Sequence, residues 1–111
     1  PFLIHDKVVY MLNEGSTGLG MFEELPFIHP GKVFIPGNAM LHCYTDGITD
    51  VENDSGQDFG MDRLREFLTS KTQFQNIEEL HGQLVANLFA FKQTRNYTDD
   101  ITLLSCLFKS K

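Results

Sequence analysis

A chain of 111 residues has room for one small domain, and its apolar fraction of 41% is sufficient for a core. The formal net charge of −6 argues against nucleic acid as a partner, because no cluster of Lys and Arg is present to neutralise phosphates. The longest uncharged apolar run is well short of a membrane span, so no membrane contact is expected from this segment. These limits leave small enzymes and protein-binding modules.

The first third of the chain is typical of short strands separated by turns. Phe2–His5 and Val8–Leu12 are apolar runs of strand type, and Asp6-Lys7 between them predicts a hairpin. A glycine-rich loop follows at residues 13–20. Further on, Val33–Ile35 predicts another short strand between two turns that contain proline and glycine.

Two stronger strands and two helices are predicted in the rest of the chain. Ala39–Thr45 and Ile101–Phe108 are almost continuously apolar, as strands buried on both faces are. Between them, Met61–Leu68 and Ile77–Phe91 carry apolar stripes at helical spacing. Asn76 begins an Asn-x-x-Glu pattern that is similar to a capping box and supports the start of the second helix. The expected fold class is therefore α+β.

The two cysteines, Cys43 and Cys106, each lie inside one of the strong strands. Their apolar surroundings favour buried, reduced thiols of a cytoplasmic protein. A cross-strand disulfide is the alternative, and it requires the two strands to be neighbours in one sheet.

Each strong strand carries an acidic motif at one end. Tyr-Thr-Asp-Gly, with Asp46, ends the first strand, and Asp-Asp-Ile-Thr, with Asp99 and Asp100, opens the second. Carboxylates at strand ends are well placed to hold a hard metal ion, because the strands fix their positions. Both strands are expected in the same sheet, which would bring Asp46 and Asp99 together. A purely structural role is the alternative, since Thr-Asp-Gly is also a common turn sequence.

Other metal chemistry is not supported by the residue spacing. The acidic stretch 50–58 lacks the glycine and glutamate of a calcium-binding EF-hand loop, because Ser55 and Met61 stand at those positions. The four histidines show no zinc spacing, and His42, inside a strand, is expected to be a packed side chain.

The ordered set of motifs resembles the bacterial branch of the metal-dependent (PPM-type) Ser/Thr phosphatases, the sporulation stage II E and sigma-regulating phosphatases. The resemblance covers essentially the whole chain and is carried by Gly15–Phe22, Pro36-Gly37-Asn38, Leu41–Asp50, Phe59-Gly60, Arg63-Leu64 and Asp99–Leu104. Asn38 and Asp50 depart mildly from the family pattern, which usually has Asp and Glu at these positions.

This resemblance implies a β-sandwich flanked by helices and a pair of Mn²⁺ or Mg²⁺ ions in a cleft at the sheet ends. Asp46 and Asp99 match metal ligands of the family, and Gly47 and Asp100 are candidates for the shell around them. The implied activity is hydrolysis of phosphoserine on a regulatory phosphoprotein, with an anti-sigma-factor antagonist as the expected substrate. Two alternatives stay open, namely a catalytically dead phosphatase-like regulator and a protein-binding module.

The family's catalytic domain is longer than this chain and has a preceding half that carries a further bridging aspartate. Residues 1–111 are therefore expected to form a single partial domain, the C-terminal half of the sandwich, with weak or no activity alone. Half a sandwich leaves strand edges and an apolar face uncovered. We therefore expect either a homo-oligomer or a smaller α+β unit.

Overall fold

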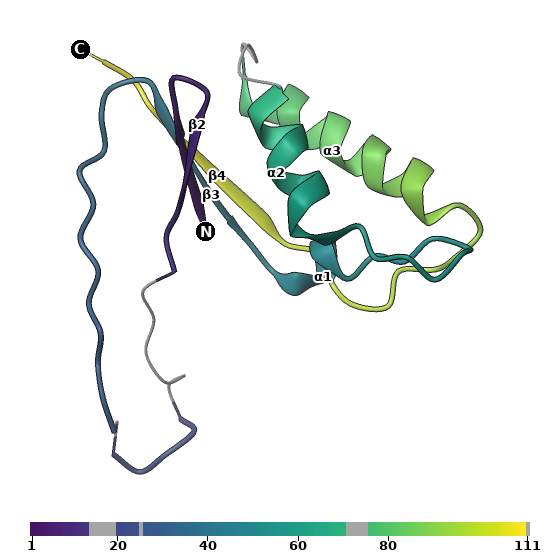
Figure 1. Cartoon of the computed structure of the whole chain (residues 1–111), viewed down its shortest axis with the longest axis horizontal. Coiled ribbons are helices and arrows are strands. Elements are labelled where there is room, and N and C mark those ends of the chain that lie inside the picture. The colour runs from purple at the N-terminus through teal and green to yellow at the C-terminus, as the bar shows by residue number, and fades with distance from the viewer. Residues whose placement is uncertain (14–19, 25, 71–75, 111) are drawn as a thin grey trace.

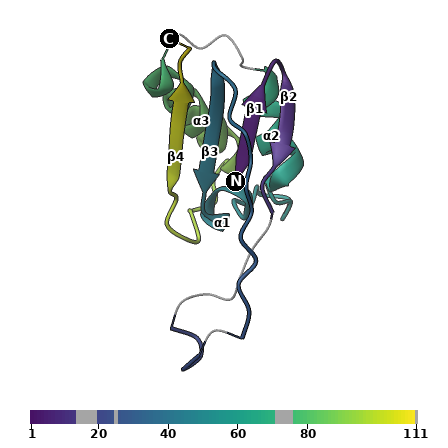
Figure 2. The ribbon, with the colours of Figure 1, turned by 90° about the vertical axis from the view of Figure 1, so that its left-hand side faces the viewer.

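The computed structural model describes residues 1–13, 20–24, 26–70 and 76–110. It consists of a four-stranded antiparallel sheet with helices packed on one face (Figure 1, Figure 2), which confirms the α+β class. The sheet order is β2-β1-β3-β4. The strands are β1 (Phe2–His5), β2 (Val8–Met11), β3 (Ala39–Tyr44) and β4 (Leu103–Phe108), and the helices are α1 (Asp46–Thr49), α2 (Gly60–Ser70) and α3 (Ile77–Lys92).

The hairpin predicted at the start of the chain is present. Phe2 pairs with Met11 and His5 pairs with Val8, so a two-residue turn joins β1 to β2. Asp6 and Lys7 both have positive φ, at 49° and 64°. Two successive left-handed residues give the turn a twist that matches the right-handed twist of the strands.

The two strong strands lie in the same sheet, as predicted, and they are direct neighbours in it. β3 lies between β1 and β4, and its register pairs Leu41 with Cys106 and Cys43 with Leu104. The two cysteines are therefore diagonal neighbours, roughly 7–8 Å apart at their Cα atoms, which is too far for a disulfide. Both thiols are free, and both are half-buried rather than fully buried.

The core lies between the helices and one face of the sheet. The sheet contributes the fully buried Phe2, and α2 and α3 contribute Leu64 and Leu84. The cluster comprises Phe2, Ile4, Ile48, Val51, Phe59, Leu64, Phe67, Leu68, Leu80, Leu84 and Leu88. Leu84 is only 1% exposed, so the predicted apolar stripe of the second helix does face the core.

The start of α3 was also predicted correctly. The Asn76 side-chain oxygen accepts a hydrogen bond from the backbone N–H of Glu79 at 2.7 Å, as a helix N-cap does. Phe89 lies within the predicted helix but does not belong to its buried stripe, because its side chain is 64% exposed. Phe89 follows the buried Leu88 by one residue, which turns it about 100° away from the core.

A long segment leaves the sheet between β2 and β3 (Figure 1, Figure 2). The short strand predicted at Val33–Ile35 is absent, because these residues pair with no strand in the described chain. The predicted glycine-rich loop at residues 13–20 lies largely outside the described residues.

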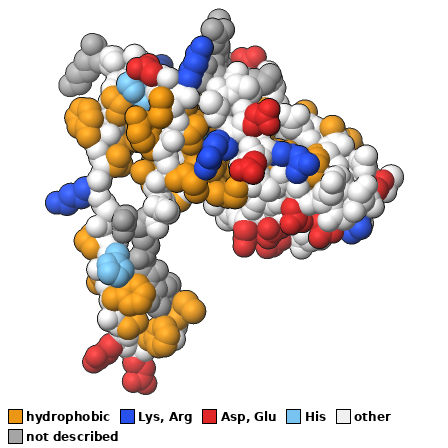
Figure 3. All heavy atoms as spheres, in the orientation of Figure 1, with side chains coloured by type: hydrophobic (Ala, Val, Ile, Leu, Met, Phe, Trp, Pro, Cys, Tyr) orange, Lys and Arg blue, Asp and Glu red, His pale blue; other side chains and the backbone are white. Residues whose placement is uncertain are grey.

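The face of the sheet away from the helices is apolar as well. The register places Tyr10, Leu104 and Phe108 on this face, and all three are exposed. Figure 3 shows hydrophobic side chains over the sheet and along the segment that leaves it. The face is only partly uncovered, because Leu3 and Ala39 also lie on it and are buried. None of the described helices is both long and apolar enough to cross a membrane.

Candidate metal and phosphate site

The two acidic motifs meet at one end of the sheet. β3 and β4 are antiparallel, so the residues that follow β3 lie beside the residues that precede β4. The backbone N–H of Thr45 donates to the carbonyl of Thr102 at 3.1 Å, and the N–H of Thr102 donates to Thr45 Oγ1 at 3.1 Å. These bonds continue the pairing beyond the strands and confirm that the acid-bearing strand ends lie together.

Gly47 allows the two motifs to make close backbone contact. A Cβ atom at Gly47 would collide with the carbonyl oxygen of Asp100, so only glycine fits there without movement of the backbone. Thr45 Oγ1 also donates to this carbonyl, at 3.4 Å. The residues on both sides of Asp46 thus touch the residue that follows Asp99. Gly47 and Asp100, expected around the metal ligands, join the two motifs through their backbones.

Asp46 and Asp99 are both exposed. Asp46 is the first residue of α1, and its carbonyl accepts hydrogen bonds from the N–H of Asp50 and the hydroxyl of Thr49. The Asp99 carboxylate accepts a bond from the N–H of Asp100 at 2.7 Å, which fixes its side chain next to its own backbone. Among the described residues, the ion pairs His5–Asp6 and Arg95–Glu52 involve neither carboxylate. Both carboxylates are therefore outside the ion pairs of the described part of the chain.

The donor atoms suit a hard divalent cation in kind. Carboxylate and carbonyl oxygens are the ligands that Mg²⁺ and Mn²⁺ prefer, and Mg²⁺ often binds through one or two carboxylates plus waters and phosphate oxygens. The described residues form no group of three or more His, Cys, Asp or Glu side chains that could hold a metal ion. Asp46 and Asp99 could thus supply part of a ligand set, and their role as ligands stays a prediction.

The acidic stretch that follows α1 is a hydrogen-bonded turn. Asn53 Oδ1 accepts from the N–H groups of Ser55 and Gln57, at 3.1 and 2.9 Å. Asp54 Oδ1 accepts from the N–H and the hydroxyl of Thr94, just beyond α3. These acceptor oxygens already take part in hydrogen bonds within the protein.

A buried polar cluster was not predicted from the sequence. His42 Nδ1 and His81 Nε2 lie 2.7 and 2.8 Å from the same hydroxyl, Ser105 Oγ. His42 is fully buried, as expected for a packed side chain, and its Nε2 atom has no hydrogen-bond partner among the described residues. Burial, and secondarily the nearby His81, lower the pKa of His42 to about 4. The cluster connects β3, α3 and β4, which contribute His42, His81 and Ser105 respectively.

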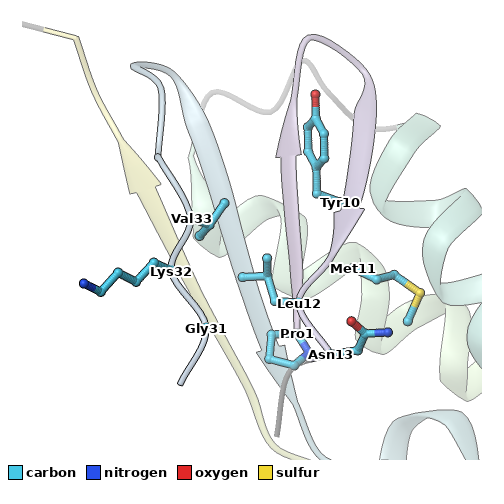
Figure 4. Close-up of a pocket in the computed structure, with 8 residues that line it drawn as sticks. All are labelled: Pro1, Tyr10, Met11, Leu12, Asn13, Gly31, Lys32 and Val33. Atoms are coloured by element: carbon cyan, nitrogen blue, oxygen red, sulfur yellow. The ribbon is translucent and has the colours of Figure 1, made fainter. Parts of the chain in front are cut away.

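A pocket of about 500 Å³ lies elsewhere, between β2 and the segment that leaves the sheet (Figure 4). Tyr10 and Leu12 line it from one side, and Lys32 and Val33 line it from the other. The described residues that line this pocket include no carboxylate and no histidine.

Comparisons with known proteins agree with the motif pattern. Residues 1–109 match the family described as Stage II sporulation protein E (SpoIIE). One curated relative is Protein IcfG of Synechocystis sp. (strain ATCC 27184 / PCC 6803 / Kazusa), which is 32% identical over 115 aligned positions. The match covers 91% of this chain and 17% of that protein, so the chain corresponds to a small part of its relative. No solved structure matches.

Proposed function

The chain belongs to the stage II sporulation protein E family, a family of PPM-type phosphatases, and on that premise we propose that it forms part of a metal-dependent protein Ser/Thr phosphatase. The observation that supports this most is the junction of the two acidic motifs. Thr45 and Gly47 both touch the Asp100 carbonyl, which holds Asp46 and Asp99 at one end of the sheet. Two exposed carboxylates at a rigid sheet end are suited to a divalent cation.

In this proposal Asp46 and Asp99 bind Mn²⁺ or Mg²⁺, the cations on which the PPM family generally depends. When bound, such ions activate a water molecule and neutralise the oxygens of a phosphoryl group. Gly47 keeps the two motifs close by leaving room for the Asp100 carbonyl. The hydrogen bond from the Asp100 N–H orients the Asp99 carboxylate.

The proposed substrate is a phosphoserine-containing regulatory protein, and an anti-sigma-factor antagonist is the specific candidate. Family membership supports this choice. A phosphorylated substrate is anionic and would be repelled by Asp46 and Asp99. A cation bound between them and the phosphoryl group offsets this repulsion. We further propose a cytoplasmic location for this activity.

A catalytically silent regulator is the second candidate. It is favoured by one observation, that the described residues form no cluster of three potential metal ligands. Under this alternative the fold and the acid junction persist, but the polypeptide binds its phosphoprotein partner without hydrolysing it. The two candidates therefore differ in one measurable quantity, because only the phosphatase releases phosphate from the phosphoprotein.

The test uses the natural polypeptide that carries residues 1–111, with a phosphoserine protein as substrate. Asp46→Asn and Asp99→Asn should each lower the rate of phosphate release at least about a hundredfold, because asparagine lacks the charge that holds the cation. Raising Mn²⁺ should partly restore the rate by mass action. Glu66→Gln removes one exposed carboxylate from α2 and should behave as the parent.

A parent polypeptide that releases no phosphate at any Mn²⁺ concentration, but still binds the phosphoprotein, would favour the silent regulator. Near-normal turnover in both aspartate variants would show that the cation is held by other residues.

A further inference from the structure

The outward side of α3 carries apolar side chains that no described residue covers. Val85 and Phe89 are 59% and 64% exposed, and Gly82 and Ala86 on the same side are exposed as well. The opposite side of the same helix is buried through Leu80, Leu84 and Leu88. Val85 and Phe89 are four residues apart, so they lie side by side on the surface of the helix. They form a small apolar patch on the outward side that no described residue buries.

The exposed positions on this side recur about every 3.5 residues, which is the spacing of side chains between two packed helices. We call these positions, together with the half-buried Lys92 at their C-terminal end, the α3 seam; its exposed members are Glu79, Gly82, Val85, Ala86 and Phe89. The seam starts with an acidic residue, has apolar and small residues in its middle, and ends with a basic residue. Lys92 is held at the end of the seam, with its Nζ atom 4.7 Å from the centre of the Phe89 ring.

Residue size along the seam is complementary to the same seam running in the opposite direction. If Val85 lies opposite Ala86 of a second copy, a large residue faces a small one. The same register places Phe89 opposite Gly82 of the second copy. A Cβ atom at Gly82 would meet nothing within 4 Å, so the surface there has open space for a ring. Each pairing occurs twice, because a two-fold axis relates the copies.

Charge along the seam is complementary in that register as well. Glu79 of each copy lies opposite Lys92 of the other, which gives two opposite-charge pairs at the ends of the seam. A parallel arrangement would place like charges together. We propose that the α3 seam is a self-association surface, and that its occupant is α3 of a second copy of this chain, packed antiparallel. A single helix pair buries less than the roughly 1,200 Å² of a standard interface, so we expect a weak, concentration-dependent dimer.

The decisive experiment swaps charge between copies in the natural polypeptide that carries residues 1–111. Glu79→Lys places like charges together at both ends of a homodimer, and Lys92→Glu does the same with the opposite sign. Sedimentation velocity over a range of concentrations should show dimerisation weakened about tenfold in each variant alone. An equimolar mixture of the two variants should dimerise as well as the parent, because both end pairs of the heterodimer are again of opposite charge.

A second variant tests the apolar centre of the seam without adding charge. Gly82→Leu fills the space that Phe89 of the second copy would occupy, and leucine is a better helix former than glycine. It should remove the dimer while the thermal unfolding midpoint stays equal to or above that of the parent. Leucine at the neighbouring exposed position, Asn87→Leu, lies off the seam and should leave dimerisation unchanged.

A parent that is monomeric at all concentrations would overturn the proposal. Failure of the mixed charge variants to associate would overturn it too, since another segment of the same polypeptide would then be the partner of α3. Dimerisation of Gly82→Leu at parental strength would place the self-association elsewhere.

Discussion

The buried imidazole of His42 should make folding stability depend on pH. In the unfolded chain this group has a pKa near 6.5, and in the folded protein burial, with His81 nearby, lowers the pKa to about 4. Between these values the unfolded state binds a proton that the folded state does not, so stability falls as the pH falls below 6.5. The contribution is fully present above this pH.

The magnitude follows from the size of the shift. One pKa unit corresponds to 1.36 kcal/mol, so the whole shift is worth about 3 kcal/mol once the pH is below the folded-state pKa. At pH 5 the loss should be about 2 kcal/mol. Ser105 can donate its hydroxyl proton to only one of the two rings, and a protonated His42 could no longer accept it at Nδ1.

The assay is urea unfolding, followed by circular dichroism at a series of pH values, for the parent and His42→Leu. Carboxylates also titrate below pH 5, so the informative quantity is the difference between the two proteins. The unfolding free energy of the parent should decline relative to His42→Leu by about 2 kcal/mol between pH 7 and pH 5. A difference that stays constant over this range would show that His42 is not held neutral by its surroundings.

Two further substitutions test the packing and the acid junction. Leu84→Asp buries an unpaired charge and should cost at least about 4 kcal/mol of stability, whereas the adjacent Val85→Asp should change thermal unfolding little because Val85 is exposed. Equal unfolding midpoints for the two variants would mean that the buried side of α3 is misassigned. Gly47→Ala should lower stability by about 1–3 kcal/mol through its collision with the Asp100 carbonyl. An unchanged urea midpoint for Gly47→Ala would refute that close contact.

Elements with a clear periodicity could be predicted from the sequence. The apolar runs of β3 and β4 predicted two strands of the same sheet, and the Asn76 capping pattern predicted where α3 begins. The prediction of a strand at Val33–Ile35 was wrong, because strand character in a sequence does not show whether a partner strand is available. α1 was missed because a four-residue helix is too short to produce an amphipathic pattern.

The candidate site could be predicted only in outline. Acidic residues at the ends of two strands were enough to expect Asp46 and Asp99 at one end of a sheet. The contact of Gly47 with Asp100 depends on backbone geometry, which a turn sequence leaves open. The cluster of His42, His81 and Ser105 depends on strand register and on the way α3 crosses the sheet. It could therefore not be predicted from the spacing of these residues along the chain.

The central claim is that Asp46 and Asp99 hold the catalytic cation together. Titration of Mn²⁺ into the natural polypeptide, followed by electron paramagnetic resonance of free Mn²⁺, measures this without depending on a substrate. Asp46→Asn and Asp99→Asn should each weaken Mn²⁺ binding at least about tenfold, because each removes a negative oxygen ligand. Glu66→Gln should bind as the parent does. Equal Mn²⁺ affinity in the parent and in both aspartate variants would contradict the account.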